Sequence, residues 1–189
     1  AIPHAPSNVI GAVIIGSPMA QIRPLPSAAF GNMFGVKPSV TSIMNVLNMP
    51  VWIGLDQSDM PNLEEPVATN EIRWEQARWM KGVIGCNSLP NFAGNLKSYD
   101  AGSMAYSWEI GNYHFVQLHA HPNYAMQGTG INTGFNITPA KNWLIKDLNA
   151  AALAGKHIAI HYANYFANQD MHLKAFFDNT PELKSALPN

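Results

Sequence analysis

The sequence predicts an α/β fold in which a layered β-sheet sandwich is flanked by helices. Three observations lead to this prediction. Short apolar runs rich in β-branched residues are typical of buried strands. Segments with apolar residues at helical spacing lie between these runs, and long loops rich in glycine, proline and asparagine separate them. The chain has 189 residues, which is enough to bury the core of one domain, and we assign residues 1–189 to a single domain.

Four runs have the composition of buried strands. The first covers residues 9–15 and the second covers residues 51–55. The third and fourth are residues 113–118 and residues 157–162. The first run is continuously apolar and rich in β-branched residues, which favours a strand that is buried on both faces, as in parallel sheets. Functional sites in such folds lie beyond the carboxyl ends of the strands, so we look for chemistry there.

Two helices are expected in the first half of the chain. Ser39 can cap the earlier one, which Pro50 ends. Asn70 can cap the later one, and its inward apolar residues are expected to be Ile72, Trp79 and Met80. The segments 18–38 and 82–102 have the composition of loops.

Two further helices are expected in the second half. Thr138 can cap the first of them, with Pro139 at its first helical position and Gly155 as its C-terminal stop. Its buried stripe consists of Trp143, Leu144, Leu148 and either Ala151 or Ala152. Asp170 can cap the last helix, which carries Leu173, Phe176 and Phe177. Residues 121–137 are expected to form a long loop.

The charge of the chain excludes some classes of partner. It contains 11 basic and 12 acidic residues, and no basic run offers a footprint for nucleic acid. No stretch approaches the ~20 apolar residues of a membrane helix. Only 12% of the residues are charged, which favours a surface of neutral polar groups and a secreted or extracytoplasmic protein. The lone Cys86 allows no internal disulfide and is expected to be a small, partly buried filler, with a nucleophilic cysteine as the alternative.

The stretch from residue 103 to residue 161 carries a family resemblance. Residues 103–118, SMAYSWEIGNYHFVQL, are similar to a hairpin with the pattern YSFDYGNVHFVQLN. Residues 143–148, WLIKDL, are similar to a helix with the pattern WLxxDL, and a strand that ends at His161 follows. In this order the pieces resemble the calcineurin-like metallophosphoesterases. The resemblance implies a metallophosphoesterase-like sandwich, and it implies that His161 binds a metal.

The first part of the chain resembles the same family at fewer positions. Residues 14–19 are similar to the family's first strand, but its Asp is missing and Met19 stands where the family has His or Gln. Gly31 and Asn32 stand where the family has Gly-Asp, so Asn32 would replace the bridging carboxylate. The family's final Gly-His-x-His has no counterpart, so we expect the usual C-terminal strands to be missing.

The segment after the second predicted strand is similar to the family pattern PVYxGLGNHD. Gln57 and Ser58 stand where the family has its Asn ligand and its catalytic His, whereas Asp59 is kept. Asp56 is a further carboxylate in this segment. Asp59 also has a simpler interpretation, in which it caps a turn before Pro61.

These assignments predict a metal-dependent phosphoesterase with an atypical or impaired metal site. Two divalent ions about 3.5–4 Å apart can hold a phosphoryl group and activate a water molecule. The ions would be Mn, Zn or Fe, and the substrate a small phosphomonoester or phosphodiester. The candidate ligands that remain are His161, Asp59, Asn32 and Asp56. Among them, Asp59 and His161 are the candidate catalytic residues.

Two other functions stay open at this point. The low charge, the aromatic content and the Asn- and Gly-rich loops also suit a secreted binding protein without catalysis, which would use the same scaffold in defence or with a toxin and would bind a glycan. Alternatively, the chain is a truncated or partly misread phosphoesterase. The start at Ala1 fits a signal peptide that has been removed or a sequence that has been trimmed.

The pair formed by His119 and His121 is a separate metal candidate. Side chains two residues apart on a strand share a face, so two imidazoles at the end of a strand can hold one metal ion. The alternative is that both are loop histidines that form hydrogen bonds with the backbone. His114, in the middle of a predicted strand, is expected to be structural.

Overall fold

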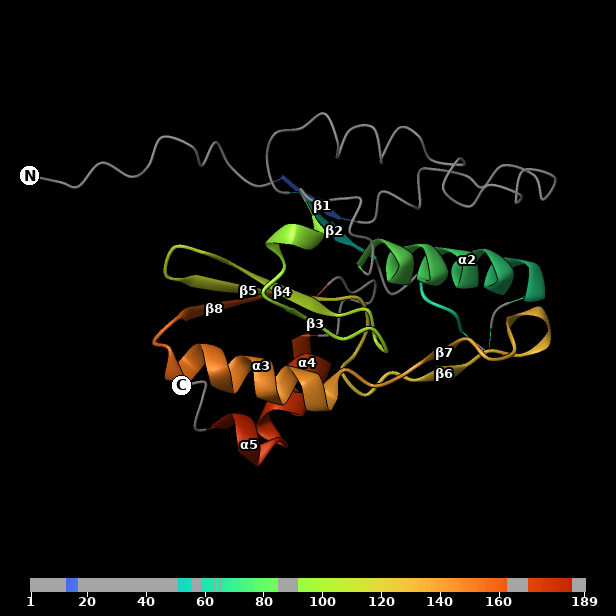
Figure 1. The fold of residues 1–189 in the computed structure, drawn as a ribbon. Helices are drawn as coiled ribbons and strands as arrows, with labels where there is room; N and C mark the ends of the chain where they lie inside the picture. The colour runs from blue at the N-terminus through green and yellow to red at the C-terminus, as the bar shows by residue number, and fades with distance from the viewer. Residues whose placement is uncertain are drawn as a thin grey trace, which may run out of the picture.

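The fold is described from a computed structural model, over residues 13–16, 51–55, 59–62, 64, 66–84, 92–162 and 170–184. These residues form an α/β fold with a mixed sheet and helices (Figure 1). The helix predicted after Ser39 lies outside the described residues, as does Cys86. None of the described helices is both long enough and apolar enough to span a lipid bilayer.

The first two described strands form a small parallel pair. β1 (Val13–Gly16) runs beside β2 (Val51–Gly54), with Val13 opposite Val51 and Gly16 opposite Gly54. The prediction of a strand at residues 51–55 is therefore confirmed. Trp52 and Ile53 of β2 and Leu55 after it are buried in the core, as their composition led us to expect.

A second sheet has four strands in the order β3-β4-β5-β8. β3 (Ser98–Tyr99) and β4 (Tyr106–Ile110) are antiparallel, and β4 forms a hairpin with β5 (Tyr113–Leu118). β8 (His157–Tyr162) pairs with β5 in parallel. The third and fourth predicted strands are confirmed at the predicted bounds, but β8 is only partly buried, with His157 exposed, so the expectation that it is a buried strand was wrong.

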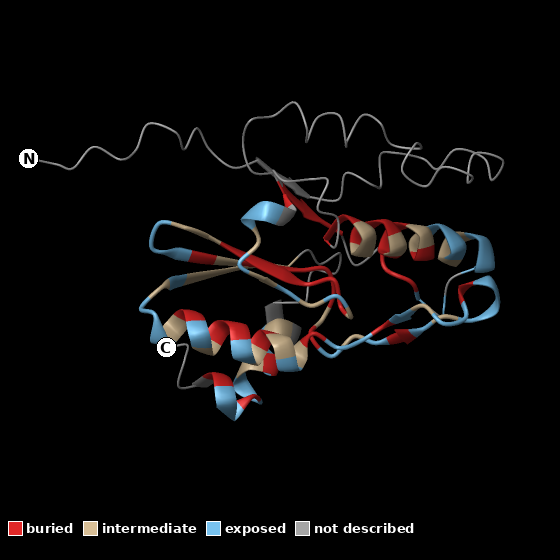
Figure 2. Cartoon of the chain, in the orientation of Figure 1, coloured by how far each residue is buried: buried red, intermediate tan, exposed pale blue. Residues whose placement is uncertain are grey.

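The four-stranded sheet is covered on both faces (Figure 2). One face packs against β2 and α2 (Val67–Ile84), in a cluster that joins Trp52, Trp74, Tyr106 and Trp108. The other face packs against α3 (Lys141–Leu153), α4 (Asp170–Asp178) and α5 (Pro181–Lys184). Side chains alternate between the two faces along a strand, so neighbouring residues of β5 enter different clusters.

The helix α2 begins earlier than predicted. The N–H of Asn70 donates to the carbonyl oxygen of Pro66, so Asn70 lies inside the first turn and does not cap it. Its side chain instead accepts a hydrogen bond from the N–H of Asn62, at 2.7 Å. Trp79 and Met80 are buried as predicted, but Ile72 is 40% exposed, so its inward assignment was wrong.

The start of α3 also differs from the prediction, whereas its end agrees. The helix begins at Lys141 with Ala140 as its N-cap, and no side chain caps it. Thr138 lies in the preceding turn, where its N–H donates to the carbonyl oxygen of Gly102. The stripe of Leu144, Leu148 and Ala151 is buried as expected, and Trp143 is half-buried.

Gly155 ends α3 in a Schellman motif. Its φ of 68° lies in the left-handed region, which favours glycine. The N–H of Gly155 donates to the carbonyl oxygen of Ala152, and the N–H of Lys156 donates to that of Ala151. This turn directs the chain into β8.

The two expected loops contain short elements. The segment 82–102 includes the end of α2, a 3-10 turn at Ala93–Asn95 and β3. The segment 121–137 includes β6 (Met126–Gln127), a 3-10 turn at Gly130–Asn132 and β7 (Asn136–Ile137), which is antiparallel to β6. Strands of two residues have no extended apolar run, so their sequence carries little signal. The helix α4 begins at Asp170, which is therefore its first helical residue and not the preceding cap that we expected.

Candidate functional site

The carboxyl ends of β2, β5 and β8 lie close to one another. The N–H of Leu55 donates to Nδ1 of His119, just beyond β5, at 2.9 Å. Gly54 lies so near Gln117 that a Cβ atom on Gly54 would be 2.8 Å from Nε2 of Gln117. Gln117 stands opposite His161 in the pairing of β5 with β8. This is the edge of the sheets at which sites of α/β folds occur.

His161 is a half-buried histidine near the end of β8. Its ring stacks on Trp108 at 5.9 Å and on Phe115 at 6.3 Å between ring centroids. Burial lowers the pKa of His161 below its ordinary value of 6.5. The imidazole is therefore uncharged at neutral pH, which is the state that binds metal ions.

A stack of buried aromatic rings supports His161. Trp108 stacks on Trp52 of β2 at 4.5 Å between centroids, with an angle of 17° between the ring planes. Nε1 of Trp52 and Nε1 of Trp108 have no hydrogen-bond partner among the described residues. A buried donor without a partner costs about 1–3 kcal/mol. Ring packing therefore joins β2 to β4, together with the hydrogen bond that the hydroxyl of Tyr106 donates to the carbonyl oxygen of Ile53 at 2.6 Å.

Asp59 is a buried carboxylate in the segment after β2. Its neighbours Met60 and Pro61 are buried as well, and Nη1 of Arg73 in α2 donates to the carbonyl oxygen of Met60 at 3.4 Å. The segment is thus anchored to α2. The other two predicted ligands, Asn32 and Asp56, lie outside the described residues.

The described residues were tested for the ligands that a divalent metal requires. No three His, Cys, Asp or Glu side chains among them lie close enough together to hold a metal ion. Protein metal sites use several such donors. The described part of the chain therefore does not by itself form a complete metal centre, and no catalytic step through a metal ion is derived from it.

The pair of His119 and His121 has the geometry of backbone-bonded loop histidines. Nδ1 of His119 accepts from Leu55, and Nε2 lies 2.9 Å from the carbonyl oxygen of Met104, to which it donates. With both nitrogens engaged, His119 has no lone pair left for a metal ion. His121 lies beyond β5, where its Nδ1 accepts from the N–H of Asn123. Only about 10 Å³ of cavity lies between these histidines and Met60.

Burial fixes the charge of His119. It lowers the pKa of this histidine to about 4, against the weaker opposing effect of the hydrogen bond to the carbonyl oxygen of Met104. His119 is therefore neutral at physiological pH. The ring of His119 joins the end of β2 to the segment before β4, because Leu55 and Met104 form hydrogen bonds with its two nitrogens.

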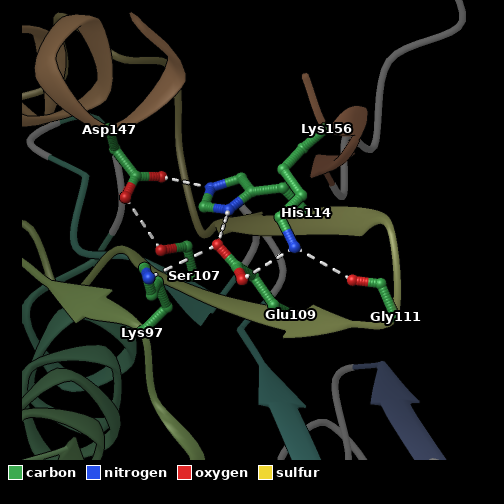
Figure 3. A network of polar contacts seen from close by, with 7 residues as sticks. All are labelled: Lys97, Ser107, Glu109, Gly111, His114, Asp147 and Lys156. Atoms are coloured by element: carbon green, nitrogen blue, oxygen red, sulfur yellow. Dashed lines mark hydrogen bonds and ion pairs between the residues drawn. The ribbon is translucent and has the colours of Figure 1, made fainter. Parts of the chain in front are cut away.

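A second polar cluster lies at the opposite end of the sheet, on the face covered by α3 (Figure 3). Nε2 of His114 lies 2.7 Å from Oδ2 of Asp147, and the hydroxyl of Ser107 donates to Oδ1 of the same carboxylate at 2.9 Å. All three side chains are buried. These residue types also form catalytic triads, but here the carboxylate separates the hydroxyl from the imidazole. The cluster has no accessible nucleophile and is structural.

The cluster continues to the turn between β4 and β5. Nδ1 of His114 lies 3.5 Å from Oε1 of Glu109, and Nζ of Lys156 lies 3.2 Å from Oε2. Nζ of Lys156 also donates to the carbonyl oxygen of Gly111, and Nζ of Lys97 lies 3.6 Å from Oε1 of Glu109. Burial raises the pKa of Glu109, but contacts with Lys156, His114 and Lys97 outweigh it and lower the pKa below the ordinary value.

The two carboxylates determine the charge of His114. Burial alone lowers its pKa, but the contacts with Asp147 and then Glu109 raise it above 6.5 overall. A structural role for His114 was expected from the sequence, but the part that Asp147 plays was not. The available signal was spacing, because Asp147 follows Leu144 by three residues and precedes Ala151 by four on the buried stripe of α3.

Comparison with known proteins gives no assignment. No protein-family model, curated protein or solved structure matches this chain. The resemblance to the calcineurin-like metallophosphoesterases therefore depends on the quoted sequence pieces. What it implies about activity remains a prediction.

Proposed function

We propose that this chain is a metal-dependent phosphoesterase with an atypical metal site at the carboxyl ends of β2 and β8. One observation carries the proposal. Gly54, at the end of β2, packs against Gln117, and Gln117 is the residue opposite His161. The segment that carries Asp59 thus starts from the same edge at which His161 ends its strand.

The proposal includes a metallophosphoesterase-like sandwich. The hairpin of β4 and β5, the helix α3 and the strand β8 follow one another in the order of the family pieces. The pair β1–β2 packs on the four-stranded sheet through Trp52 and Trp108. Such packing of two sheets supports the layered arrangement.

Each proposed residue would supply one kind of ligand atom. His161 would donate an imidazole nitrogen, Asp59 a carboxylate oxygen, and Asn32 and Asp56 further oxygens. A bound divalent ion would polarise the phosphoryl group and activate water. The protein's own contribution is to keep His161 neutral through burial and to hold its ring on Trp108 and Phe115.

Metal content and turnover test the proposal together. We expect the protein supplied with Mn²⁺, Zn²⁺ or Fe to retain metal after desalting and to hydrolyse an aryl phosphate. His161→Ala should reduce both by at least about 10-fold, because even groups that only orient a metal ligand commonly contribute that much. His157→Ala is the matched control, since His157 lies on the same face of β8 but is exposed. Absence of both metal and turnover with all three metals would contradict the proposal.

A glycan-binding protein without catalysis is the second candidate. It is favoured by the lack of a three-ligand group among the described residues, and by the half-exposed rings of Tyr99 and Tyr113. Aromatic rings offer a large apolar surface with a polar end, which suits a sugar. A glycan array separates the two candidates, because specific glycan binding by metal-free protein that lacks turnover would favour this function over hydrolysis.

A further inference from the structure

His114 lies between two carboxylates that come from different elements. On one side, Nε2 is 2.7 Å from Oδ2 of Asp147 in α3. On the other side, Nδ1 is 3.5 Å from Oε1 of Glu109 in β4 (Figure 3). Only 2% of the side chain of His114 is exposed, so water cannot substitute freely for either contact. The imidazole therefore links the helix to the sheet.

The protonation state of the ring decides whether both contacts are favourable. A neutral imidazole has one N–H group and one lone pair, whichever tautomer is present. Either tautomer would turn a lone pair towards an ionised carboxylate. The imidazolium donates to Asp147 and carries the charge opposite to that of both carboxylates. Glu109 is held as an ion pair, because Nδ1 of His114 has no hydrogen-bond partner among the described residues. We propose that protonated His114 is a pH-sensitive clamp that holds α3 on the amino end of the sheet, and that its deprotonation loosens this contact.

The charges around His114 favour this arrangement. Glu109 has two further cationic partners, Lys156 before β8 and Lys97 before β3. Asp147 receives a hydrogen bond from Ser107 of β4, and among the described residues its ion-pair partner is His114. The β8 residue opposite His114 is Ile158, which carries no charge. The clamp therefore matters most for Asp147 and for the helix that carries it.

The directions of the pKa shifts define the pH range of the clamp. In His114 burial opposes the charge, but Asp147 and Glu109 raise the pKa above 6.5. The stabilisation that protonated His114 gives the fold is fully present below pH 6.5, its pKa in the unfolded chain. This stabilisation is lost as the pH rises through the higher pKa of His114 in the folded protein. The pKa of Glu109 is lowered from 4.5 in the folded protein. The contribution of ionised Glu109 to stability is therefore fully present above pH 4.5 and is lost as the pH falls through the lower pKa of the folded state. Both ion pairs of the clamp are therefore fully formed between pH 4.5 and pH 6.5.

Thermal unfolding of matched variants tests the clamp. We compare the full chain, His114→Gln and the exposed control His157→Gln from about pH 5.5 to about pH 8.5. The advantage in Tm of the unaltered protein over His114→Gln should shrink by about 2–4 °C across this range. His157→Gln should follow the unaltered protein. A difference between the unaltered protein and His114→Gln that does not change with pH would overturn the proposal.

Titration of the unaltered protein gives a second answer that needs no variant. The ring protons of His114, followed by NMR, should titrate with a midpoint above 6.5. Amide hydrogen exchange in α3 should accelerate once the pH passes that midpoint, beyond the increase seen in α2. A midpoint at or below 6.5, or equal acceleration in both helices, would overturn the clamp even if His114→Gln does not fold.

Discussion

His114 and His119 lie at opposite ends of β5, and both are almost inaccessible, at 2% and 1% exposed. His114 faces the carboxylates of Asp147 and Glu109. His119 instead accepts from the N–H of Leu55 and donates to the carbonyl oxygen of Met104. The ionised neighbours of His114 favour an imidazolium, whereas the backbone partners of His119 fit a neutral ring.

The comparison shows that partners decide the charge of a buried histidine, because burial acts on both rings in the same direction. Burial lowers the pKa of His119 to about 4, but at His114 the carboxylates outweigh it. The two ends therefore respond to pH with opposite sign. Between pH 6.5 and about 4 the unfolded chain binds a proton that folded His119 does not, so acid weakens this end. The His114 end weakens when the pH rises.

The largest expected effect comes from removing Asp147, the carboxylate that favours the charged form of His114. Asp147→Ala should lower the free energy of unfolding by about 3–5 kcal/mol, because it leaves a buried imidazolium and the Ser107 hydroxyl without their partner. Urea denaturation at neutral pH measures this loss. Asp178→Ala is the control, since its ion pair with Lys174 is exposed and worth about 0.5 kcal/mol. Equal losses in both variants would mean that the buried cluster contributes nothing special.

The second prediction concerns His119, at the carboxyl end of β5. The unaltered protein should lose about 3 kcal/mol through His119 as the pH falls from 6.5 to 4, which follows from the lowered pKa. In His119→Leu this pH-dependent loss should disappear, although the variant should be less stable at neutral pH because Leu55 and Met104 lose their partner. Chemical denaturation of both proteins across this range measures the difference. Parallel curves would show that His119 is not the group that titrates.

The smallest expected effect concerns the close approach of β2 to β5. In Gly54→Ala the new methyl group would lie 2.8 Å from Nε2 of Gln117, so the amide must move, at a cost of about 1–2 kcal/mol. Adding Gln117→Ala should recover part of this loss in a double-mutant cycle. Gly82→Ala in α2 is the control of opposite sign, because nothing lies within 4 Å of its Cβ position and alanine favours a helix. No coupling between residues 54 and 117 would contradict the contact.

Sequence patterns predicted the elements whose signal lies in their own residues. The strands at 113–118 and 157–162 are rich in aromatic and β-branched residues, and Gly155 ends α3 because the turn requires a positive φ. The short strands β3, β6 and β7 depend on partners elsewhere in the chain, and nothing in their own residues requires them. The position of Ile72 likewise depends on what packs against α2.

The polar clusters were harder to predict for a related reason. Asp147 lies on the buried stripe of α3, but a search for apolar periodicity passes over a charged residue. Its burial makes sense only once His114 and Ser107 are opposite it, and they belong to another element. The bonds of His119 to Leu55 and Met104 join residues that only the tertiary fold brings together. The predicted ligands Asn32 and Asp56 lie outside the described residues, so that part of the site stays a prediction.

The parallel pairing of β5 with β8 has a consequence for the order of folding. The hairpin of β4 and β5 joins near neighbours, whereas the bond between Ser107 and Asp147 closes a separation of 40 residues. Closing a loop of this size costs chain entropy before the contacts offset it, so we expect the hairpin to form first and α3 with β8 to dock onto it. Before α3 docks, His114 is expected to be hydrated. The ion pair of His114 with Asp147 would then contribute nothing to the stability of the transition state for folding. Weakening it would shorten the lifetime of the native state while leaving the rate of its formation nearly unchanged.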